Sequence, residues 1–357
     1  MEKNEIIVIY GNSPEEMAYK LAAAADLAGL IGGKTVRVGL KPNLVLSQPA
    51  EGGATTHPEI AAGLIRYLRE NGFNNLVILE GSWVGDSTKQ AFARCGYAEL
   101  ARKTGVELVD TQKDSYTPKD CRGMKIEIAD SALKVGFMIN LPVMKGHCQT
   151  AVTCALKNNK GIISDREKRR FHSQGLTKPI AHLNTVARND FILVDSICGD
   201  LDFEEGGNPI PTGRMFASRD PVLCDAWAAD QMGYSLSEVP YIGLAASLGV
   251  GEADIKKALV REINRGPDAP VLPRAAGKAR QYAARIKEDQ ACSACYAALI
   301  RALSRMDRLP ETVCIGQGFK GKTGGLGVGV CTKGFKQSVP GCPPSAAEIM
   351  AFIGKRT

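Results

Sequence analysis

Four cysteines in the last part of the chain have the spacing and the neighbours of metal-cluster ligands. Cys292 and Cys295 are separated by two residues in a helix-like segment, so their thiolates lie one turn apart. Cys331 follows Gly-Val-Gly-Val, and Cys342 stands between a glycine and two prolines. Glycine lets backbone N–H groups approach inorganic sulfide closely, and a cysteine followed by proline is typical of iron–sulfur ligation in ferredoxins. The pattern predicts a [4Fe–4S] cluster held by these four cysteines.

Zinc, or unmetallated thiols in the core or in a disulfide, are the alternatives. Zinc ribbons usually combine two CxxC knuckles, and only one knuckle is present because Cys331 and Cys342 are widely spaced. Cys314 lies in an apolar run and is expected in the core, although it is the fifth candidate ligand. The other cysteines are singletons, and most are expected to be small buried residues: Cys95, Cys121, Cys148, Cys154, Cys198 and Cys224.

The same region contains the pattern of a phosphate-binding P-loop, from Gly316 to Gly321-Lys322-Thr323. That mechanism requires a helix directly after the threonine, whose backbone N–H groups hold the phosphates. Thr323 is followed instead by Gly-Gly-Leu-Gly-Val-Gly-Val, a very poor helix-forming run. The glycines are therefore assigned to the iron–sulfur site.

The elements that must position these residues follow from hydrophobic periodicity. Short runs rich in Val, Ile and Leu alternate with helical patterns, which predicts an α/β fold with a mostly parallel sheet and helices on both faces. The expected strands are 5–10, 35–40, 75–79, 106–109, 135–139 and 191–194, and the expected helices are 14–30, 57–70, 87–104, 220–232, 238–248 and 252–258. Three prolines in 266–273 indicate a linker. We expect an α/β domain at 1–265 and a small C-terminal iron–sulfur α/β module at 266–357, beginning with a mostly helical segment at 274–306.

Polar side chains follow several of the expected strands at their carboxyl ends, where ligands bind in open parallel sheets. The segment 151–163 is expected to be a helix ending near Gly161, which would bring two more residues to this edge. The residues expected to bind substrate are Lys41, Asn43, Glu80, Ser82, Lys157 and Asn158.

Three further residues at this edge are expected to be catalytic: Lys145, His147 and Asp195. His147 has the chemistry of a general acid or base near neutral pH, and Lys145 can stabilise developing negative charge. Each residue also has a structural alternative, because a lone histidine is more often hydrogen-bonded in the core and Asp195 can cap the next segment. Their convergence on one edge indicates a small anionic substrate.

The composition is that of an ordinary soluble globular protein, with 44% hydrophobic and 23% charged residues among 357. No apolar stretch reaches membrane-spanning length and no secretory leader precedes the first strand, so we expect a cytoplasmic protein that does not bind membranes. The net charge of +7 is spread along the chain, and no nucleic-acid-binding motif accompanies it. The densest basic cluster, 166–170, is either a solvated face or part of an anion pocket.

Several motifs resemble the family catalogued as domain of unknown function 362, over about residues 35–250. These motifs are Lys41-Pro-Asn-Leu, Glu80-Gly-Ser, Asn140-Leu-Pro-Val-Met-Lys-Gly-His, Ala155-Leu-Lys-Asn-Asn-Lys-Gly and Asp220-Pro-Val-Leu-Cys-Asp. The resemblance implies an iron–sulfur protein of a kind common in anaerobes, with the cluster module placed at the C-terminus. It implies no particular reaction.

Three functions fit these observations. The first is a redox enzyme or electron-transfer protein that acts on a small anionic substrate and exchanges electrons with a partner protein. The second is a non-redox isomerase or lyase in which Lys145 and His147 do acid/base chemistry and the cluster is structural. The third is a non-catalytic electron carrier or binding module.

Overall fold

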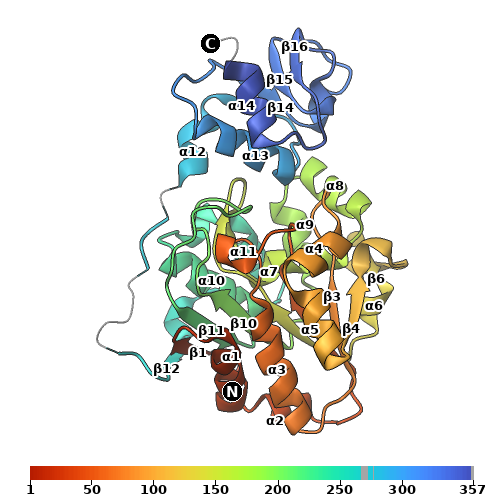
Figure 1. Ribbon diagram of the computed structural model, residues 1–357, viewed down its shortest axis with the longest axis vertical. Coiled ribbons are helices and arrows are strands. Elements are labelled where there is room, and N and C mark those ends of the chain that lie inside the picture. The colour runs from red at the N-terminus through yellow and green to blue at the C-terminus, as the bar shows by residue number, and fades with distance from the viewer. Residues whose placement is uncertain (267–271, 276, 355–357) are drawn as a thin grey trace.

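Eight strands form one sheet at the centre of the large domain, in the order β12-β1-β11-β10-β7-β2-β3-β4. β11 runs antiparallel to both of its neighbours, and every other pair is parallel, which confirms the mostly parallel sheet. The strands are β1 (Glu5–Tyr10), β2 (Val38–Pro42), β3 (Leu76–Glu80), β4 (Glu107–Asp110), β7 (Phe137–Leu141), β10 (Phe191–Ser196), β11 (Arg214–Ser218) and β12 (Leu259–Glu262). This computed structural model describes residues 1–266, 272–275 and 277–354 (Figure 1).

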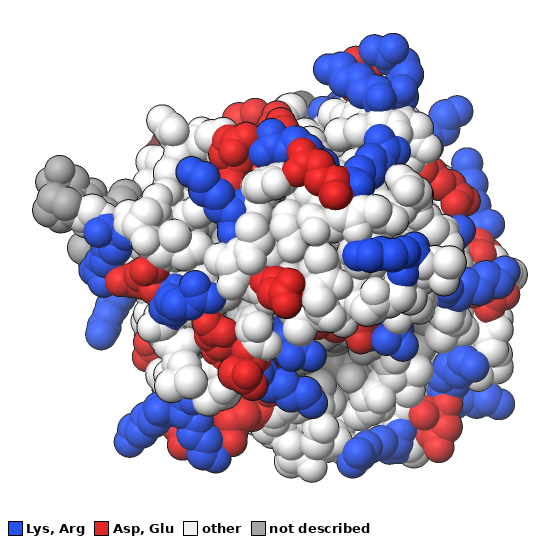
Figure 2. Space-filling view, turned by 90° about the horizontal axis from the view of Figure 1, so that it is seen from below, with Lys and Arg blue, Asp and Glu red and all other residues white. Residues whose placement is uncertain are grey.

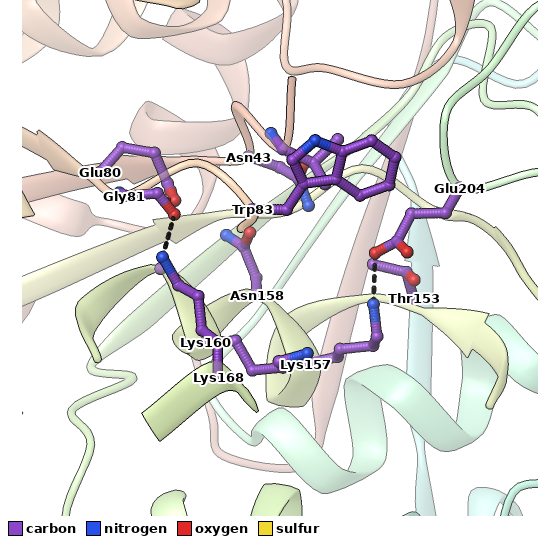
Figure 3. A pocket seen from close by; sticks show the side chains of 12 residues that line it. Asn43, Glu80, Gly81, Trp83, Thr153, Lys157, Asn158, Lys160, Lys168 and Glu204 are labelled. Atoms are coloured by element: carbon purple, nitrogen blue, oxygen red, sulfur yellow. Dashed lines mark hydrogen bonds and ion pairs between the residues drawn. The ribbon is translucent and has the colours of Figure 1, made fainter. Parts of the chain in front are cut away.

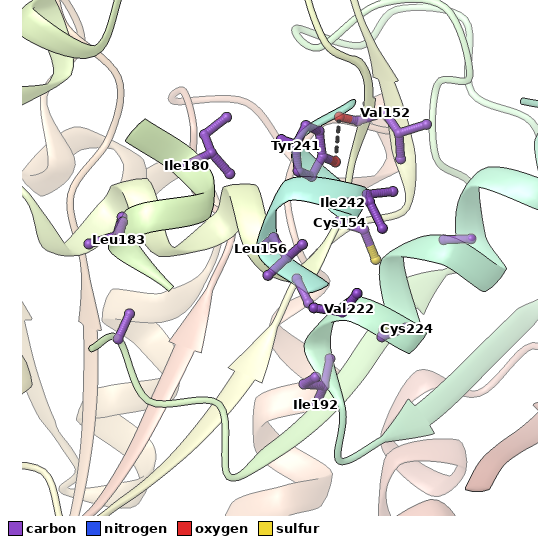
Figure 4. Packing of buried hydrophobic residues seen from close by; sticks show 14 of the residues in the cluster. Val152, Cys154, Leu156, Ile180, Leu183, Ile192, Val222, Cys224, Tyr241 and Ile242 are labelled. Carbon is purple, nitrogen blue, oxygen red and sulfur yellow. Dashed lines mark hydrogen bonds between the residues drawn. The ribbon is translucent and has the colours of Figure 1, made fainter. Parts of the chain in front are cut away.

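Helices cover both faces of this sheet, because its strands are apolar on both sides. In β1, Ile6 and Val8 belong to one buried cluster, whereas Ile7 and Ile9 belong to the other. The first cluster packs under α7 (Ala155–Asn158), α8 (Asp165–Ser173), α9 (Thr177–Leu183), α10 (Pro221–Gln231) and α11 (Pro240–Ser247), part of which Figure 4 shows. The second packs under α1 (Pro14–Ala24), α2 (Leu27–Ile31), α3 (Pro58–Glu70), α4 (Thr88–Arg94) and α5 (Tyr97–Thr104).

Two expected helices in the large domain are wrong in type. The segment expected to be helical at 151–163 begins as β9 (Ala151–Thr153), which pairs with β8 (Lys145–His147), and becomes α7 and a 3-10 turn (Asn159–Ile162) only afterwards. The segment expected to be helical at 252–258 forms a 3-10 turn (Ile255–Lys257) and leads into β12. At 151–153 tertiary strand pairing outweighs local helix propensity, whereas 252–258 lies before the paired residues of β12, which begin at Leu259.

Two further expected helices are each broken once. The helix expected at 14–30 divides at Asp26, which adopts a left-handed conformation (φ 51°) and caps α2 by accepting the Gly29 N–H. The helix expected at 87–104 divides at Gly96 (φ 80°). A hairpin of β5 (Tyr116–Cys121) and β6 (Met124–Ala129), followed by α6 (Asp130–Leu133), was not anticipated.

The small domain is a parallel four-stranded sheet with helices packed on it. Its strands are β13 (Ile286–Glu288), β14 (Val313–Ile315), β15 (Leu326–Val328) and β16 (Gln337–Val339), and its helices are α12 (Lys278–Ala283), α13 (Ser293–Leu303) and α14 (Ala346–Gly354). The expected helical segment 274–306 therefore includes one strand, β13. After Thr323 the chain enters β15 and no helix, so the requirement of a P-loop is not met. Most of the expected linker, 267–271, lies outside the described residues.

The small domain sits above the large one, with α13 facing the end where α8 lies (Figure 1). Gln149 donates to Glu288 Oε1 (2.8 Å) and to the Ala291 carbonyl (3.1 Å), and Arg301 donates to the Gly206 carbonyl (3.0 Å). On the face seen from the opposite end, basic and acidic side chains are interspersed (Figure 2). Within the described residues, no helix has the length and apolar character needed to cross a membrane.

Candidate functional site

A polar cavity lies where β2 and β3 end, beneath the loop that carries Trp83 (Figure 3). Including its open mouth, the space is about 400 Å³. Its lining consists of Asn43, Val45, Glu80, Gly81, Trp83, Thr153, Lys157, Asn158, Lys160, Gly161, Lys168 and Glu204. Four of the residues expected to bind substrate are therefore brought together: Asn43, Glu80, Lys157 and Asn158.

Lys41 and Ser82, also expected to bind substrate, lie behind this lining. The Lys41 ammonium is fully buried and hydrogen-bonded to Glu80 Oε2. Burial lowers the pKa of Lys41 and raises that of Glu80, while the opposite charge of each partner counteracts that effect. The Ser82 hydroxyl donates to the Leu44 carbonyl (2.7 Å), which fixes the loop above the cavity. Both residues support the cavity without lining it.

Glu204 is the centre of a buried network that the sequence did not reveal. Its Oε1 accepts from Lys157 Nζ (2.5 Å) and its Oε2 lies 2.8 Å from His147 Nε2. The Lys145 ammonium donates to the Glu204 carbonyl (3.0 Å) and to the Ala54 carbonyl (2.5 Å). Although burial opposes its charge, His147 and Lys157 hold the pKa of Glu204 well below its usual range.

His147 and Lys145, the expected catalytic pair, therefore contact Glu204 and do not line the cavity. His147 Nδ1 accepts the N–H groups of Gln149 and Thr150, both at 3.0 Å, which leaves the ring proton on Nε2, toward Glu204. Burial lowers the pKa of His147 to about 4 and that of Lys145 to about 7. At neutral pH the imidazole is neutral, and although Nε2 lies 2.8 Å from Glu204 Oε2, the two atoms do not have hydrogen-bond geometry.

Asp195, the third expected catalytic residue, lies elsewhere. Its Oδ2 accepts from the backbone N–H (2.9 Å) and from Nδ1 (2.7 Å) of His57, the residue before α3. Burial lowers the pKa of His57, but the charge and the hydrogen bond of the Asp195 carboxylate have a larger effect and raise it to about 11. This buried pair anchors the start of α3.

Lys160 differs from the other lysines of the cavity. Lys168 Nζ lies 3.2 Å from Asp165 Oδ1 and Lys157 faces Glu204, whereas no ion pair to Lys160 is found among the described residues. Its nearest polar neighbour is His172 Nε2, at 3.4 Å. Burial, together with the charge of Lys157, lowers the pKa of Lys160 to about 7.

Unpartnered polar atoms also face this region. Thr153 Oγ1, which belongs to the cavity lining, is buried without a hydrogen-bond partner among the described residues. His172 Nδ1 is in the same state. Because buried polar groups are normally hydrogen-bonded, these atoms indicate a site that accepts a polar ligand or water.

The four cysteines expected to bind a cluster line a single second cavity in the small domain. Cys292 precedes α13, Cys295 lies in its first turn, Cys331 follows β15 and Cys342 follows β16. The cavity, about 290 Å³ including its open mouth, is completed by Ile315, Gly316, Gln317, Val328, Gly329, Val330 and Gly341. Cys314, the fifth candidate, is not part of this lining.

Two glycines in this lining, one of which begins the pattern that resembles a P-loop, bring the backbone close to its neighbours. At Gly316 (φ 126°) an added Cβ would lie 2.0 Å from the Asp289 carbonyl oxygen, so a side chain is excluded there. Gly329 (φ 86°) lies directly beside Cys295, and an added Cβ would be 3.6 Å from its Sγ. These glycines allow the backbone to wrap closely around the thiols.

The thiols surround the cavity at a wider spacing than one metal ion requires. Tetrahedral zinc, with Zn–S of about 2.3 Å, places its sulfurs about 3.8 Å apart. Among the described residues, three candidate ligand atoms come within 4.8 Å of one another only at Cys154, Cys224 and Asp225. That group lies in the apolar core (Figure 4), where Asp225 accepts the Ala155 N–H (2.7 Å) at the start of α7.

Burial and the neighbouring thiols raise the pKa values of Cys292 and Cys295. All eleven cysteines are free, and Cys342 is exposed. Of the six singletons expected in the core, four are buried, whereas Cys148 and Cys198 are half-buried.

A third cavity, about 330 Å³ including its open mouth, lies between the other two. It shares Trp83, Lys160, Lys168 and Glu204 with the polar cavity and Cys292 with the cysteine cavity. Val84, His172, Ser293 and Ala294 complete its lining. The Ser293 hydroxyl lies 3.4 Å from His172 Nε2, so α13 and α8 meet here.

Three residues of the site were not predicted, although each lies next to a recognisable sequence feature. Trp83 directly follows the Glu-Gly-Ser motif, and Glu204 stands in Phe-Glu-Glu-Gly-Gly, where acidic residues precede a glycine pair. His172 lies beside the basic cluster of α8, and Lys168 of that cluster lines the polar cavity. One residue of the basic cluster, Lys168, thus lines the polar cavity, whereas Arg166 is exposed.

Comparisons with known proteins give a family and distant structural similarities. The profile described as Domain of unknown function (DUF362) matches residues 38–230, over half of the chain. A thylakoid-associated protein of Synechocystis sp. is 23% identical over 230 residues, which are 60% of this chain and 68% of that protein.

Two solved structures are distantly similar to this chain. The lactate racemase apoprotein of Thermoanaerobacterium thermosaccharolyticum has 16% identity and a TM-score of 0.43 over 65% of this chain and 57% of the racemase chain. A protein of Thermotoga maritima has 13% identity and a TM-score of 0.39 over 87% of this chain and 71% of that one. The matched region thus spans little more than half of the racemase chain.

Proposed function

The chain belongs to the DUF362 family, and we propose that it is an iron–sulfur redox protein that passes electrons to or from a small anionic substrate. In this proposal Cys292, Cys295, Cys331 and Cys342 hold one [4Fe–4S] cluster. The substrate occupies the polar cavity at the strand ends of the large domain, where Lys160 binds its negative charge.

One observation carries the proposal: the cavity between the domains is lined by Cys292 on one side and by Lys160 on the other. A cluster on the four cysteines would therefore adjoin the substrate. The wide spacing of the thiols favours a multi-iron core over a single zinc ion, and the close approach of Gly329 suits hydrogen bonds to sulfur. When bound, such a cluster supplies or accepts electrons at a potential set by its surroundings.

In this proposal the chain's own residues bind the substrate and orient the side chains that line the polar cavity. Lys145 and His147 hold Glu204, and Glu204 fixes Lys157 at the edge of the cavity. Asn158 donates to Asn140 Oδ1 (2.7 Å), which orients its amide in the lining. Removal of water by Trp83 and by α13 strengthens the electrostatic attraction between Lys160 and an anion.

Electrons are proposed to enter through the exposed side of the cluster site. Cys342 is exposed, and the neighbouring Val330 presents 45% of its surface to solvent. A partner redox protein that docks there would approach the cluster from the side opposite the substrate. Because free thiols persist in a reducing compartment, we place the protein in the cytoplasm, in keeping with anaerobic metabolism.

A second candidate function, non-redox acid/base catalysis, is favoured by the pKa of about 7 at Lys160. An amine that titrates near neutral pH can take or give a proton at a substrate carbon. In that case the cluster would be structural, and activity would survive its replacement.

Iron and acid-labile sulfide analysis of anaerobically purified protein tests the leading proposal. We expect about four irons and about four sulfides per chain. Cys331→Ala and Cys342→Ala should each lower the iron content sharply, whereas Cys314→Ala, on the neighbouring strand, should leave it unchanged. One zinc per chain, or equal losses in all three variants, would refute the ligand assignment.

A further inference from the structure

The polar cavity and the cavity between the domains are adjacent halves of one region, because four residues line both: Trp83, Lys160, Lys168 and Glu204. Trp83 belongs to both linings, and Figure 3 shows its indole ring above the lysines of the polar cavity. Both linings contain Lys160, Lys168 and Glu204, and the polar cavity adds Lys157 and the amides of Asn43 and Asn158. The cavity between the domains adds the apolar side chains of Val84 and Ala294. A ligand at the shared lysines therefore has an apolar wall on the side of Trp83, Val84 and Ala294.

The charge balance limits the ligand to one negative charge. Glu80, Asp165 and Glu204 each face one lysine: Lys41, Lys168 and Lys157, respectively. Lys160 is left as the cation of the cavity for which the described residues provide no carboxylate. A dianion such as phosphate would meet the carboxylates of Glu80 and Glu204 with only this one uncompensated charge opposite it.

The wall beside Lys160 is aromatic and held in place before any ligand binds. The backbone N–H of Trp83 donates to the Val45 carbonyl (2.9 Å), and the backbone N–H of Ser82 donates to Thr88 Oγ1 (3.0 Å). The indole is therefore presented on a rigid loop. Flat conjugated groups stack on such a face more favourably than their buried area alone would give.

We propose that the ligand is a small aromatic or conjugated monocarboxylate, with its carboxylate on Lys160 and its flat body against Trp83, beside Cys292. This inference names the substrate class of the proposed function and uses the same site. It depends on the geometry of the cavity, and the binding test below does not require that a cluster be present. The unpartnered hydroxyl of Thr153 provides a further donor for the carboxylate.

The test is calorimetric titration of the anaerobically purified full chain with four probes. We expect benzoate to bind, and cyclohexanecarboxylate, which has the same charge but is not flat, to bind about fivefold more weakly because it cannot stack. Benzamide, which is flat but uncharged, and inorganic phosphate should each bind at least about tenfold more weakly. Benzoate should also change the fluorescence of Trp83, measured in a Trp227→Phe background because the chain has two tryptophans.

Lys160→Met keeps the length of the side chain and removes its charge, and we expect it to weaken benzoate binding at least about tenfold. Lys103→Met is the matched control, because Lys103 is an exposed lysine on α5 with 67% of its side chain accessible, and it should bind benzoate normally. Thermal unfolding of each variant checks that it is folded, and benzoate titration of Trp83→Phe gives a second, independent readout of stacking.

The proposal is overturned if benzoate gives no binding, if phosphate or cyclohexanecarboxylate binds as well as benzoate, or if Lys160→Met is without effect. Iron is measured in the same samples, which separates the two proposals. Benzoate binding without iron would refute the cluster and keep the ligand class. A full iron content without benzoate binding would refute the ligand class and support the cluster.

Discussion

The two candidate sites differ in how the protein treats the groups it buries. In the large domain, the buried lysines Lys41, Lys157 and Lys168 each face a carboxylate of the same domain. In the small domain, four cysteines surround one cavity, and burial together with the other thiols raises the pKa of Cys295. Paired charges need no ligand to be stable. Among the described residues, the thiols around this cavity have no charged internal partner, so we infer that the small domain depends on a bound group and the large domain does not.

The largest expected effect comes from removing the bound group. In Cys331→Ser/Cys342→Ser protein, we expect backbone amides of β14 to β16 to lose most of their protection from hydrogen exchange, because a small domain of this size has little core of its own. Amides of β2, β3 and β7 should keep theirs. Hydrogen exchange followed by mass spectrometry measures both regions in one sample. Equal protection of the small domain in wild-type and mutant protein would contradict the comparison.

Within the large domain, breaking the buried network around Glu204 should lower the free energy of unfolding substantially. Glu204→Gln leaves Lys157 buried without its carboxylate, and we expect a loss of about 4 kcal/mol in the free energy of unfolding. Glu99→Gln is the control, because Glu99 is exposed on α5 and its pairs with Arg102 and Lys103 contribute little. Urea denaturation of both variants gives the difference, and a loss below about 1 kcal/mol for Glu204→Gln would show that the network is not structural.

Glu205 is an exception to the pairing of charges in the large domain. Both of its carboxylate oxygens are buried without a hydrogen-bond partner among the described residues, and burial raises its pKa to about 7. In the unfolded chain its pKa is about 4.3, so between these two values the folded state holds a proton that the unfolded state has released. Stability contributed at this position therefore falls as the pH rises from about 4.3 to 7.

Glu205→Gln keeps the neutral form at every pH. We expect it to change the free energy of unfolding little at pH 5 and to raise it by about 2 kcal/mol at pH 8. Thermal unfolding at the two pH values measures the difference. An equal effect at both would show that Glu205 has an ordinary pKa.

The smallest expected effect concerns Lys160. Because Lys160 has no carboxylate partner among the described residues, Lys160→Met should change the free energy of unfolding by less than about 1 kcal/mol, or raise it by relieving a buried charge. Lys157→Met leaves the buried Glu204 carboxylate without its lysine partner, and we expect it to lower the free energy of unfolding by about 3 kcal/mol. A similar cost for both lysines would remove the distinction between a structural and a ligand-binding lysine.

Much of the fold follows from the sequence because its signals are local. Runs such as 5–10 and 191–194 are apolar without interruption, and they form strands buried on both faces. The short β8 and β9 were missed because their stability comes from pairing with each other and from burial, which a local pattern does not contain. The same holds for β12, which is exposed and pairs along the edge of β1.

Part of the candidate site was also predictable from the sequence, because the strands that carry it have a local signal. The carboxyl ends of parallel strands converge, so Asn43 and Glu80 were placed correctly at one edge. Glu204 comes from a loop far along the chain, and its contact with Lys157 depends on how that loop folds back. The separation of Asp195 from Lys145 and His147 depends equally on side-chain direction, since Asp195 turns toward His57.

The central claim is that residues 292, 295, 331 and 342 hold one iron–sulfur core. Electron paramagnetic resonance of the anaerobically purified full chain, before and after reduction with dithionite, tests it most directly. We predict a signal in the reduced sample that integrates to about one spin per chain, is lost in Cys331→Ala and Cys342→Ala, and is retained in Cys314→Ala. A spectrum without that signal, from protein that contains one zinc per chain, would contradict the account.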